Sequence, residues 1–393
     1  MLILKWNFNM REILPYGRHS ITEEDISAVT QTLRSSYLTQ GPKVKEFEEK
    51  FASYVGSNYA VAVSNGTAAL HLCAMVMNVN SDSTVITSPI TFAASANCIR
   101  YCNGTVDLCD IEKDTGVIDI EELRKKLAAA PEGKYDGLVI VDFAGYPADM
   151  EAFRGLADEY GLWIIEDSCH AVGAWFFDQN GTKQKSGNGH FADLAIFSFH
   201  PVKHIACGEG GIITTNDKAL YQRLLKLRTH GITKDATQFS QANEGGWYYE
   251  MQELGYNYRM PDILCALGIS QLDRVEKGIA RRQEIARMYN KAFSENDIKV
   301  LGDSENKGHA YHLYIILIPN RKELYKLLQE QNIYTQVHYI PLHHLPYYKT
   351  LLPGDLNLPN SDSYYEQCLS LPMYPTLTDE DVQYVITAVL SLA

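Results

Sequence analysis

Short apolar runs alternate with amphipathic segments along the first two thirds of the chain. The runs have the length and flanking turns of buried strands, which we expect at 59–64, 84–88, 105–110, 137–142, 162–165, 194–199 and 212–215. Helical spacing of apolar positions predicts helices at 23–35, 44–55, 66–77, 120–129, 150–160 and 218–228. This alternation predicts an α/β fold with a mostly parallel sheet and a ligand at the carboxyl ends of its strands.

The pattern changes after about residue 255. A long helical region is expected up to about 293, followed by a strand at 311–318, a helix at 322–331 and a strand at 334–338. These elements predict a smaller α+β domain. We therefore expect a large domain at 10–255, and linker helices with a small C-terminal domain at 256–393.

Three segments lack the periodicity of a core element. Residues 1–9 have neither a period nor a strand partner, which indicates a flexible tail. The polar stretch 178–190 is expected to be an exposed hairpin. The stretch 233–249, rich in Gly, Gln and aromatic residues, is expected to be a mobile flap near the site.

Charge and composition restrict the possible partners. The 393 residues are 46% hydrophobic and carry a net charge of −13 without a basic block, which argues against nucleic acid. No apolar run approaches the ~20 residues of a membrane span, and the start lacks the pattern of a signal peptide, so we expect a cytoplasmic protein without a membrane partner. The eight cysteines form no paired Cys-x-x-Cys array, which favours reduced thiols and no metal.

An acid and an amine follow two of the core strands. Asp167 comes directly after the strand at 162–165, and Lys203 lies in a glycine-closed loop after the strand at 194–199. A lysine in a loop is usually solvated. The combination nevertheless fits pyridoxal 5′-phosphate (PLP), because the acid can bind the pyridinium nitrogen and the amine can bond to the aldehyde.

A third segment opens a predicted helix directly after a strand. Asn65, Gly66 and Thr67 leave free N–H groups at the helix start, which suits the phosphate of a cofactor. An ordinary strand-to-helix turn explains the same residues equally well.

The motifs together resemble a known family. Glu166-Asp167 with His170, the run from Ser198 to Lys203, and Gly208-Glu209-Gly210-Gly211 resemble the DegT/DnrJ/StrS sugar aminotransferases within the fold-type I PLP enzymes. The resemblance covers nearly the whole chain. It implies that Lys203 and Asp167 are catalytic, and that Phe92 stacks on the pyridine ring. The implied cofactor-binding residues are Asn65, Gly66, Thr67, Phe92, Asp167, His170, Ser198, Lys203 and Asn257.

The same resemblance implies a homodimer with shared active sites. In the family, the motif that contains Asn257 crosses to the partner subunit and reaches the cofactor phosphate there. From the residues alone, Asn257 could equally cap a turn.

The substrate is implied by segments that PLP binding does not require. Residues 38–42, 247–254 and 371–375 resemble the branch of the family that serves pseudaminic acid biosynthesis. They imply transfer of an amino group from L-glutamate to C4 of a UDP-4-keto-6-deoxy-N-acetylhexosamine. The candidate substrate-binding residues are Thr39, Gln40, Gly41, Tyr248, Arg259 and His343.

Other functions stay open at this point. A different nucleotide-linked keto sugar, such as the bacillosamine-type xylo substrate, would use the same cofactor residues, because pocket shape sets stereochemistry. A non-catalytic, sugar-nucleotide-binding regulator of the same fold is a further alternative. The related dehydratases replace the cofactor lysine with histidine, and the retention of Lys203 disfavours that branch.

Overall fold

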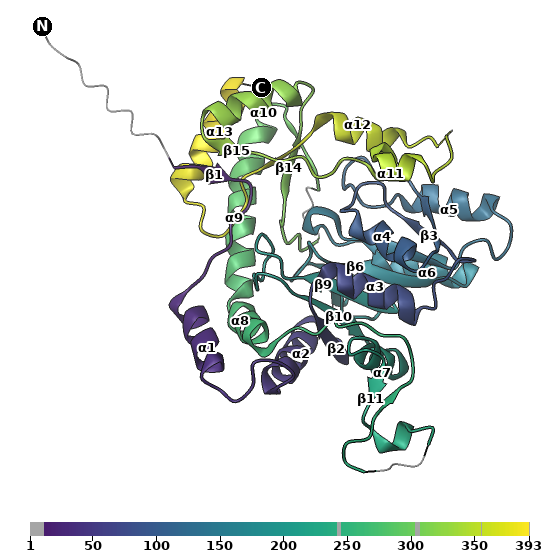
Figure 1. The fold of residues 1–393 in the computed structure, drawn as a ribbon. Helices are drawn as coiled ribbons and strands as arrows, with labels where there is room; N and C mark the ends of the chain where they lie inside the picture. Colours follow the sequence, from purple (N-terminus) through teal and green to yellow (C-terminus); the bar gives the residue numbers. More distant parts are fainter. Residues whose placement is uncertain (1–11, 242–244, 303–306, 355, 393) are drawn as a thin grey trace, which may run out of the picture.

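The computed structural model describes residues 12–241, 245–302, 307–354 and 356–392. Its centre is a seven-stranded sheet with the strand order β2-β10-β9-β6-β5-β3-β4 (Figure 1). The strands are β2 (Tyr59–Val63), β3 (Thr84–Thr87), β4 (Thr105–Leu108), β5 (Gly137–Val141), β6 (Trp163–Asp167), β9 (Leu194–Ser198) and β10 (Gly211–Thr215). All neighbouring pairs are parallel except those of β10, which runs antiparallel to β2 and β9. The predicted α/β fold with a mostly parallel sheet is confirmed.

Helices cover both faces of this sheet, and adjacent strand residues point into different apolar clusters. Val85 packs on the side of α3 and α4, whereas Ile86 packs on the side of α5 and α6. Because both faces are buried, the strands are mostly apolar. The helices are α3 (Gly66–Val76), α4 (Ala94–Tyr101), α5 (Ile120–Ala129), α6 (Met150–Tyr160) and α7 (Lys218–Leu227).

Local sequence explains where several of these helices begin. The side chains of Asp119, Asp149 and Asp217 each accept a hydrogen bond from a first-turn N–H group of the helix that follows. Such caps satisfy donors that have no partner inside the helix. They also fix the point at which each chain segment leaves the sheet.

Further helices surround one end of the sheet. α8 (Asp262–Leu272) packs against α1 (Glu23–Leu33) and α2 (Pro42–Val55). The 20-residue helix α9 (Val275–Ser294) then runs from this group toward the C-terminal unit (Figure 1).

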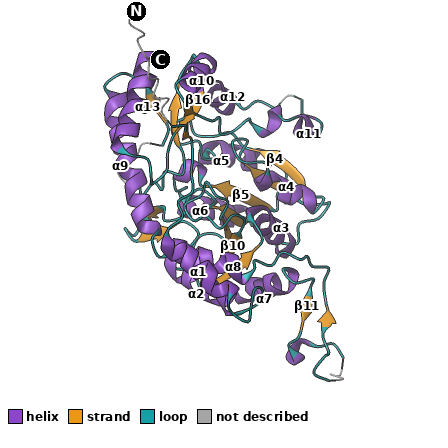
Figure 2. Cartoon of the chain, turned by 60° about the vertical axis from the view of Figure 1, so that its left-hand side comes forward, coloured by secondary structure: helices purple, strands orange, loops and turns teal. Residues whose placement is uncertain are grey.

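The C-terminal unit contains a three-stranded antiparallel sheet, β13 (Lys299–Val300), β14 (Tyr314–Leu317) and β16 (Cys368–Leu371). Figure 2 shows helices packed around this sheet. They include α10 (Arg321–Glu330), α12 (Pro359–Gln367) and α13 (Asp379–Leu392), with the short helices η3 (Leu342–His344) and α11 (Pro346–Lys349) in the intervening loop. A separate apolar cluster that includes Phe293, Ile316 and Val385 forms its core.

The strand expected at 334–338 is wrong for most of its length. Only β15 (Ile333–Tyr334) forms, and it pairs in parallel with β1 (Leu14–Pro15). Pairing stops because β1 is only two residues long. Beyond it, Gln336 keeps a single bridge to Ser370.

The three aperiodic segments have different outcomes. The polar stretch 178–190 contains β8 (Lys183–Lys185), which pairs in antiparallel with β7 (Trp175–Phe177) just before the stretch. A hairpin is therefore present with shifted bounds. The expected flap contains β11 (Ile232–Thr233) and η2 (Ala236–Gln238) and leads to β12 (Glu250–Met251). Its residues 242–244 and the expected tail 1–9 lie outside the described residues.

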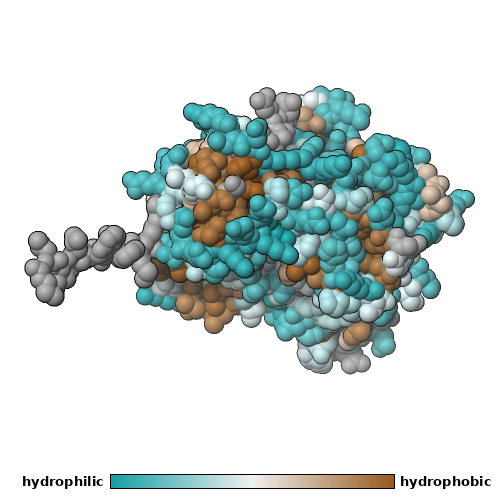
Figure 3. Space-filling view, turned by 90° about the horizontal axis from the view of Figure 1, so that it is seen from above, coloured by the Kyte–Doolittle hydropathy of each residue, from teal (hydrophilic) through white to brown (hydrophobic). Residues whose placement is uncertain are grey.

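The domain boundaries stay a prediction, and Met10 and Arg11 lie outside the described part of the chain. On the molecular surface, Figure 3 shows mostly hydrophilic residues with apolar patches among them. Within the described ranges, no helix combines the length and the hydropathy needed to cross a membrane.

Candidate active site

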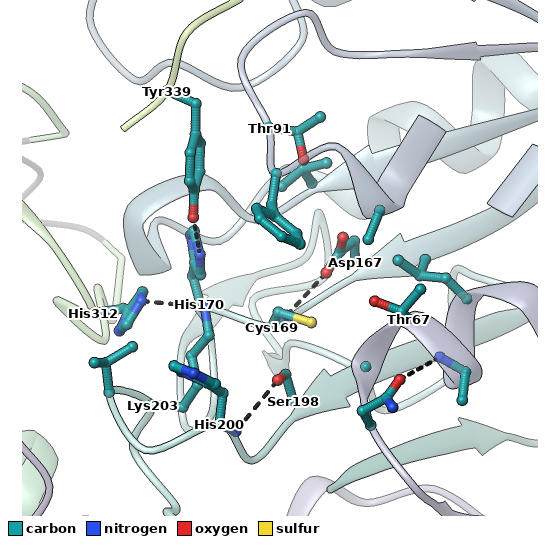
Figure 4. A pocket seen from close by; sticks show the side chains of 18 of the residues that line it. Thr67, Thr91, Asp167, Cys169, His170, Ser198, His200, Lys203, His312 and Tyr339 are labelled. Atoms are coloured by element: carbon teal, nitrogen blue, oxygen red, sulfur yellow. Dashed lines mark hydrogen bonds between the residues drawn. The ribbon is translucent and has the colours of Figure 1, made fainter. Parts of the chain in front are cut away.

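A cavity of about 660 Å³ opens at the carboxyl ends of β6 and β9 (Figure 4). It contains eight of the nine residues predicted to bind the cofactor. These are Asn65, Gly66, Thr67, Phe92, Asp167, His170, Ser198 and Lys203. The sheet therefore brings residues at or after the ends of four strands, β2, β3, β6 and β9, to one place, as expected for strand ends that meet at one edge.

One end of the cavity has the features of an oxyanion site. The Asn65 carboxamide oxygen accepts a hydrogen bond from the Ala68 N–H group at 2.8 Å, which starts α3. The Ser198 hydroxyl lies opposite this helix start, so close that a Cβ on Gly66 would lie 3.0 Å from Ser198 Cβ. A side chain at position 66 would thus fill the space in front of the helix N–H groups, which attract anions.

Asp167 lies in the middle of the cavity and is 5% exposed. Its Oδ2 accepts a hydrogen bond from Ser95 Oγ at 2.7 Å, and its Oδ1 accepts one from the Cys169 N–H group at 3.2 Å. These two donors fix the orientation of the carboxylate. Phe92 also lines the cavity, and it is 60% exposed in the single chain.

Lys203 approaches the cavity from the loop after β9. Its Nζ lies 3.2 Å from His312 Nε2. Burial lowers the pKa of Lys203, and it lowers the pKa of His312 well below the usual value. Both effects favour the neutral forms, and a neutral amine is the form that can accept a proton.

His170 is held from both sides of its ring. The Ala144 N–H group donates to His170 Nδ1 at 3.2 Å, and burial keeps the His170 pKa well below its usual value. The neutral ring therefore carries its proton on Nε2, which lies 3.2 Å from Tyr339 Oη (Figure 4). His170 thereby holds the Tyr339 ring at the cavity.

Several cavity residues were not predicted from the sequence. Tyr339, His338 and His312 reach the cavity from the C-terminal unit, and Tyr16 reaches it from the N-terminal segment. The cofactor-binding residues were predicted from their position at the ends of strands of the large sheet, and none of these four residues lies at such an end. The aromatic and histidine content of the loop after β15 was the available hint.

Glu166 belongs to the motif that carried the resemblance, but it does not line the cavity. It is buried beside Asp142, and the Ser168 hydroxyl oxygen lies 3.0 Å from Glu166 Oε1 and 2.9 Å from Asp142 Oδ2. Burial, together with the nearby Asp142, raises the Glu166 pKa well above its usual value. A protonated Glu166 would share a proton within this pair, which is a structural role.

The remaining predicted residues do not line this cavity in the single chain. Asn257 forms an isolated bridge with Thr229, and Arg259 forms one with Val63. The six that were predicted to bind substrate all lie outside it: Thr39, Gln40, Gly41, Tyr248, Arg259 and His343. Their roles stay predictions.

Some of these residues have other partners. The Gly41 N–H group donates to Asp262 Oδ2 at 2.8 Å, and Tyr248 Oη donates to Glu250 Oε1 at 3.1 Å. His343 Nε2 lies 2.9 Å from Asp362 Oδ1.

The cavity residues fit PLP by their chemistry. An oxyanion cradle with a glycine packed closely against Ser198, an oriented carboxylate, a partly desolvated lysine amine and an aromatic ring line one cavity. The phosphate, the pyridine nitrogen, the aldehyde and the ring face of PLP each require one of these groups.

Comparison with known proteins gives the same answer. Residues 19–390 match the DegT/DnrJ/EryC1/StrS aminotransferase family. The spore coat polysaccharide biosynthesis protein SpsC of Bacillus subtilis is 38% identical, with 96% of each chain covered. The UDP-4-amino-4,6-dideoxy-N-acetyl-beta-L-altrosamine transaminase of Campylobacter jejuni is 36% identical, with 97% of each chain covered.

Solved structures of similar proteins share the fold. Helicobacter pylori PseC, described as an aminotransferase involved in the biosynthesis of pseudoaminic acid, has a TM-score of 0.87 at 30% identity, with 97% of this chain and 99% of that one covered. The PMP form of a putative sugar aminotransferase from Streptococcus pneumoniae has a TM-score of 0.87 at 31% identity, covering 96% and 98%. Its PLP form has a TM-score of 0.86 at 29% identity, covering 97% and 98%. The chain therefore belongs to the DegT/DnrJ/EryC1/StrS aminotransferase family and is a PLP-dependent sugar aminotransferase.

Proposed function

We propose that this enzyme moves the amino group of L-glutamate to C4 of a UDP-4-keto-6-deoxy-N-acetylhexosamine, as a step of pseudaminic acid biosynthesis. The observation that carries the transfer itself is the meeting of Lys203, Asp167 and the oxyanion cradle in one cavity. The choice of sugar is supported by the 36% identity to the Campylobacter jejuni transaminase over 386 residues and by the likeness to PseC.

The chain supplies the groups that hold the cofactor. PLP, when bound, acts as an electron sink that stabilises negative charge on the donor carbon. The Asp167 carboxylate would hold a proton on the pyridine nitrogen through a charge-assisted hydrogen bond. The first-turn N–H groups of α3 and the Ser198 hydroxyl would bind the phosphate, and the Phe92 ring would pack on the pyridine.

Lys203 has two successive roles in this proposal. With PLP bound, its Nζ would form the covalent link to the aldehyde in the resting enzyme. Once freed by the donor amino acid, the neutral amine would serve as the base that accepts and returns the donor-carbon proton. His312, whose Nε2 lies 3.2 Å from Lys203 Nζ, keeps the displaced amine beside this path.

A second keto sugar has its own support. SpsC, named for spore coat polysaccharide biosynthesis, is 38% identical to this chain, slightly more than the Campylobacter jejuni transaminase. A different nucleotide-linked keto sugar, including the bacillosamine-type xylo substrate, is therefore the alternative. A non-catalytic regulator is not retained, because the chain belongs to a family of aminotransferases.

Competition between two keto sugars tests the substrate. We expect the enzyme, supplied with glutamate and an equal mixture, to prefer UDP-2-acetamido-2,6-dideoxy-β-L-arabino-hexos-4-ulose over its xylo-configured C5 epimer. NMR of the amine product should show UDP-4-amino-4,6-dideoxy-N-acetyl-β-L-altrosamine. Preference for the xylo epimer would reassign the substrate and leave the aminotransferase reaction intact.

We also propose that the enzyme works as a homodimer with shared sites. Several large apolar side chains are exposed in the segments that resemble the pseudaminic branch or flank them. Their exposed fractions are 56% for Tyr37, 48% for Leu38, 76% for Trp247 and 72% for Leu254. A partner subunit would cover such surface, and it would bring its own Asn257 to the phosphate end of the cavity.

Mixing two inactive variants tests the shared site. We expect an equal mixture of Lys203→Ala and Asn257→Ala subunits to recover up to about a quarter of wild-type activity. Half of the dimers then contain one subunit of each kind, and each of these mixed dimers has one intact site of two. Subunit exchange is followed with two affinity tags, and each variant mixed with itself is the control. Complete exchange without recovery would contradict shared sites.

A further inference from the structure

Arg282 on α9 is a buried cation that has no carboxylate partner among the residues that the structure describes. Its side chain is 1% exposed, and no ion pair to it is found within the described ranges. Its Nη1 instead donates to three backbone carbonyl oxygens, those of Met373 at 2.7 Å, Tyr311 at 3.1 Å and His312 at 3.4 Å. The carbonyl groups bind the guanidinium but do not neutralise it.

Burying this uncompensated charge would only destabilise the fold if the Arg282 side chain served packing alone. Taking a charge out of water costs several kcal/mol unless an opposite charge compensates it. Burial lowers the pKa of Arg282 to about 10, so the group is still protonated at neutral pH. The fold thus contains a permanent positive charge at a fixed place.

That place lies next to the cofactor lysine. Arg282 binds the backbone of His312, and His312 contacts Lys203 through Nε2. Arg282 and Lys203 also line a common cavity of about 500 Å³ on the α9 side of the lysine. The neighbouring residue Arg281 differs, because Glu284 and Asp379 neutralise it.

The charged and titratable groups around Lys203 act in different directions. Burial has the largest effect and lowers the pKa of Lys203, the negative charge of Asp167 raises it, and the positive charge of Arg282 lowers it. Burial also raises the pKa of Cys169 well above its usual value, so this thiol is neutral. The histidines around the amine are neutral because burial lowers the pKa of each one. They are His170 from the loop after β6, His204 from the loop after β9, His312 from the segment before β14, and His338 from the loop after β15.

We propose that Arg282 is a positioning residue for Lys203, which holds the His312 backbone and keeps the Lys203 amine neutral with a fixed positive charge. A neutral amine can attack the cofactor aldehyde and can accept a proton, whereas an ammonium group can do neither. Asp167 is needed at the pyridine nitrogen and favours a protonated lysine. Arg282 offsets that influence from the other side of the amine.

Two substitutions separate the charge from the hydrogen bonds. Arg282→Gln keeps an N–H donor for the carbonyl groups and removes the charge, and Arg282→Lys keeps the charge. The amine must be neutral to react, so activity rises with pH through the Lys203 pKa. We expect Arg282→Gln to move this acid limb to higher pH by about one unit, and Arg282→Lys to leave it nearly unchanged.

A second measurement does not depend on turnover. The full-length enzyme, with PLP dialysed away, is acetylated with trace acetic anhydride at a series of pH values, and mass spectrometry gives the rate at Lys203. We expect a rise of about one unit in the midpoint for Arg282→Gln. Arg281→Gln is the matched control, because it removes a neutralised charge from the same helix and should leave the midpoint in place.

The outcomes decide between a positioning and a structural role. A shift in Arg282→Gln that Arg282→Lys does not share supports the proposal. Equal midpoints in Arg282→Gln and wild type overturn the proposal, and so does an equal shift in Arg282→Lys. If Arg282→Gln does not fold, a shifted midpoint in Arg282→Lys overturns it.

The inference about Arg282 rests on the role proposed for Lys203, but a different experiment contradicts each of the two. Borohydride labelling reports which lysine bonds to PLP, whereas the acetylation midpoint reports the amine itself.

Discussion

Replacement of Lys203 by alanine is expected to lower turnover by roughly 10⁴-fold or more, because one side chain supplies both the covalent link and the proton transfer. We expect the native enzyme to be yellow because of the covalent link to PLP, and we expect the variant to lack this link. Activity with glutamate and the keto sugar measures the first effect. Borohydride reduction followed by peptide mass spectrometry measures the second, and it should place the label on Lys203 in the wild-type enzyme.

Lys218→Ala is the matched control for this experiment, since Lys218 is exposed at the start of α7. It should keep full activity and the label on Lys203. A label on another lysine in the wild-type enzyme would overturn the assignment of Lys203. Thermal unfolding of the two variants checks that any loss of turnover is not a loss of fold.

Replacement of Asp167 by asparagine is the second change with a large expected effect. The amide oxygen can still accept the hydrogen bond from the Cys169 N–H group, and the amide NH2 can donate to the Ser95 hydroxyl oxygen, so the fold should be kept. It cannot hold a positive charge on the pyridine nitrogen, so the electron sink weakens. We expect the proton-transfer step to slow by about 10²-fold or more, as measured by single-turnover absorbance with glutamate.

Ser95→Ala separates the charge of Asp167 from its orientation. This variant removes the 2.7 Å hydrogen bond to Oδ2 and leaves the carboxylate in place. We expect a smaller loss than for Asp167→Asn, because the charge remains. An Asp167→Asn enzyme with wild-type single-turnover rates would refute the role of the carboxylate.

The large-domain elements were predictable because each follows a local rule. β5 and β6 read as apolar runs of strand length, and α5 and α6 have both a helical period and an aspartate cap at the start. The cofactor candidates followed from the same rules. Strand ends in a parallel sheet meet at one edge, so residues after separate strands could be placed together without knowing the packing.

The residues from outside the large domain could not be found this way. Tyr339 reaches the cavity only because the C-terminal unit packs over the sheet, and its place is fixed by a hydrogen bond to His170. Arg282 lies on a helix with an ordinary amphipathic pattern, in which an arginine at a core position is easily taken for a surface residue. Their roles depend on contacts between residues far apart in sequence, which no local pattern encodes.

The substrate candidates had a different limitation. Thr39, Gln40 and Gly41 were chosen by resemblance, and in the single chain this turn is tied to Asp262 at the start of α8. Tyr248 and His343 likewise have partners within the chain.

The antiparallel strand β10 also has a consequence for how the protein is made. β2 emerges early from the ribosome, but in the described structure its strand partner is β10, which begins only at Gly211. β3 and β4 are parallel neighbours and can pair as soon as the short crossover between them is complete. The sheet can therefore assemble from its β3–β4 edge toward β10. The segment that carries Asn65, Gly66 and Thr67 reaches its final place only when β10 fills the gap between β2 and β9, so the phosphate end of the cavity is among the last parts of this sheet to form.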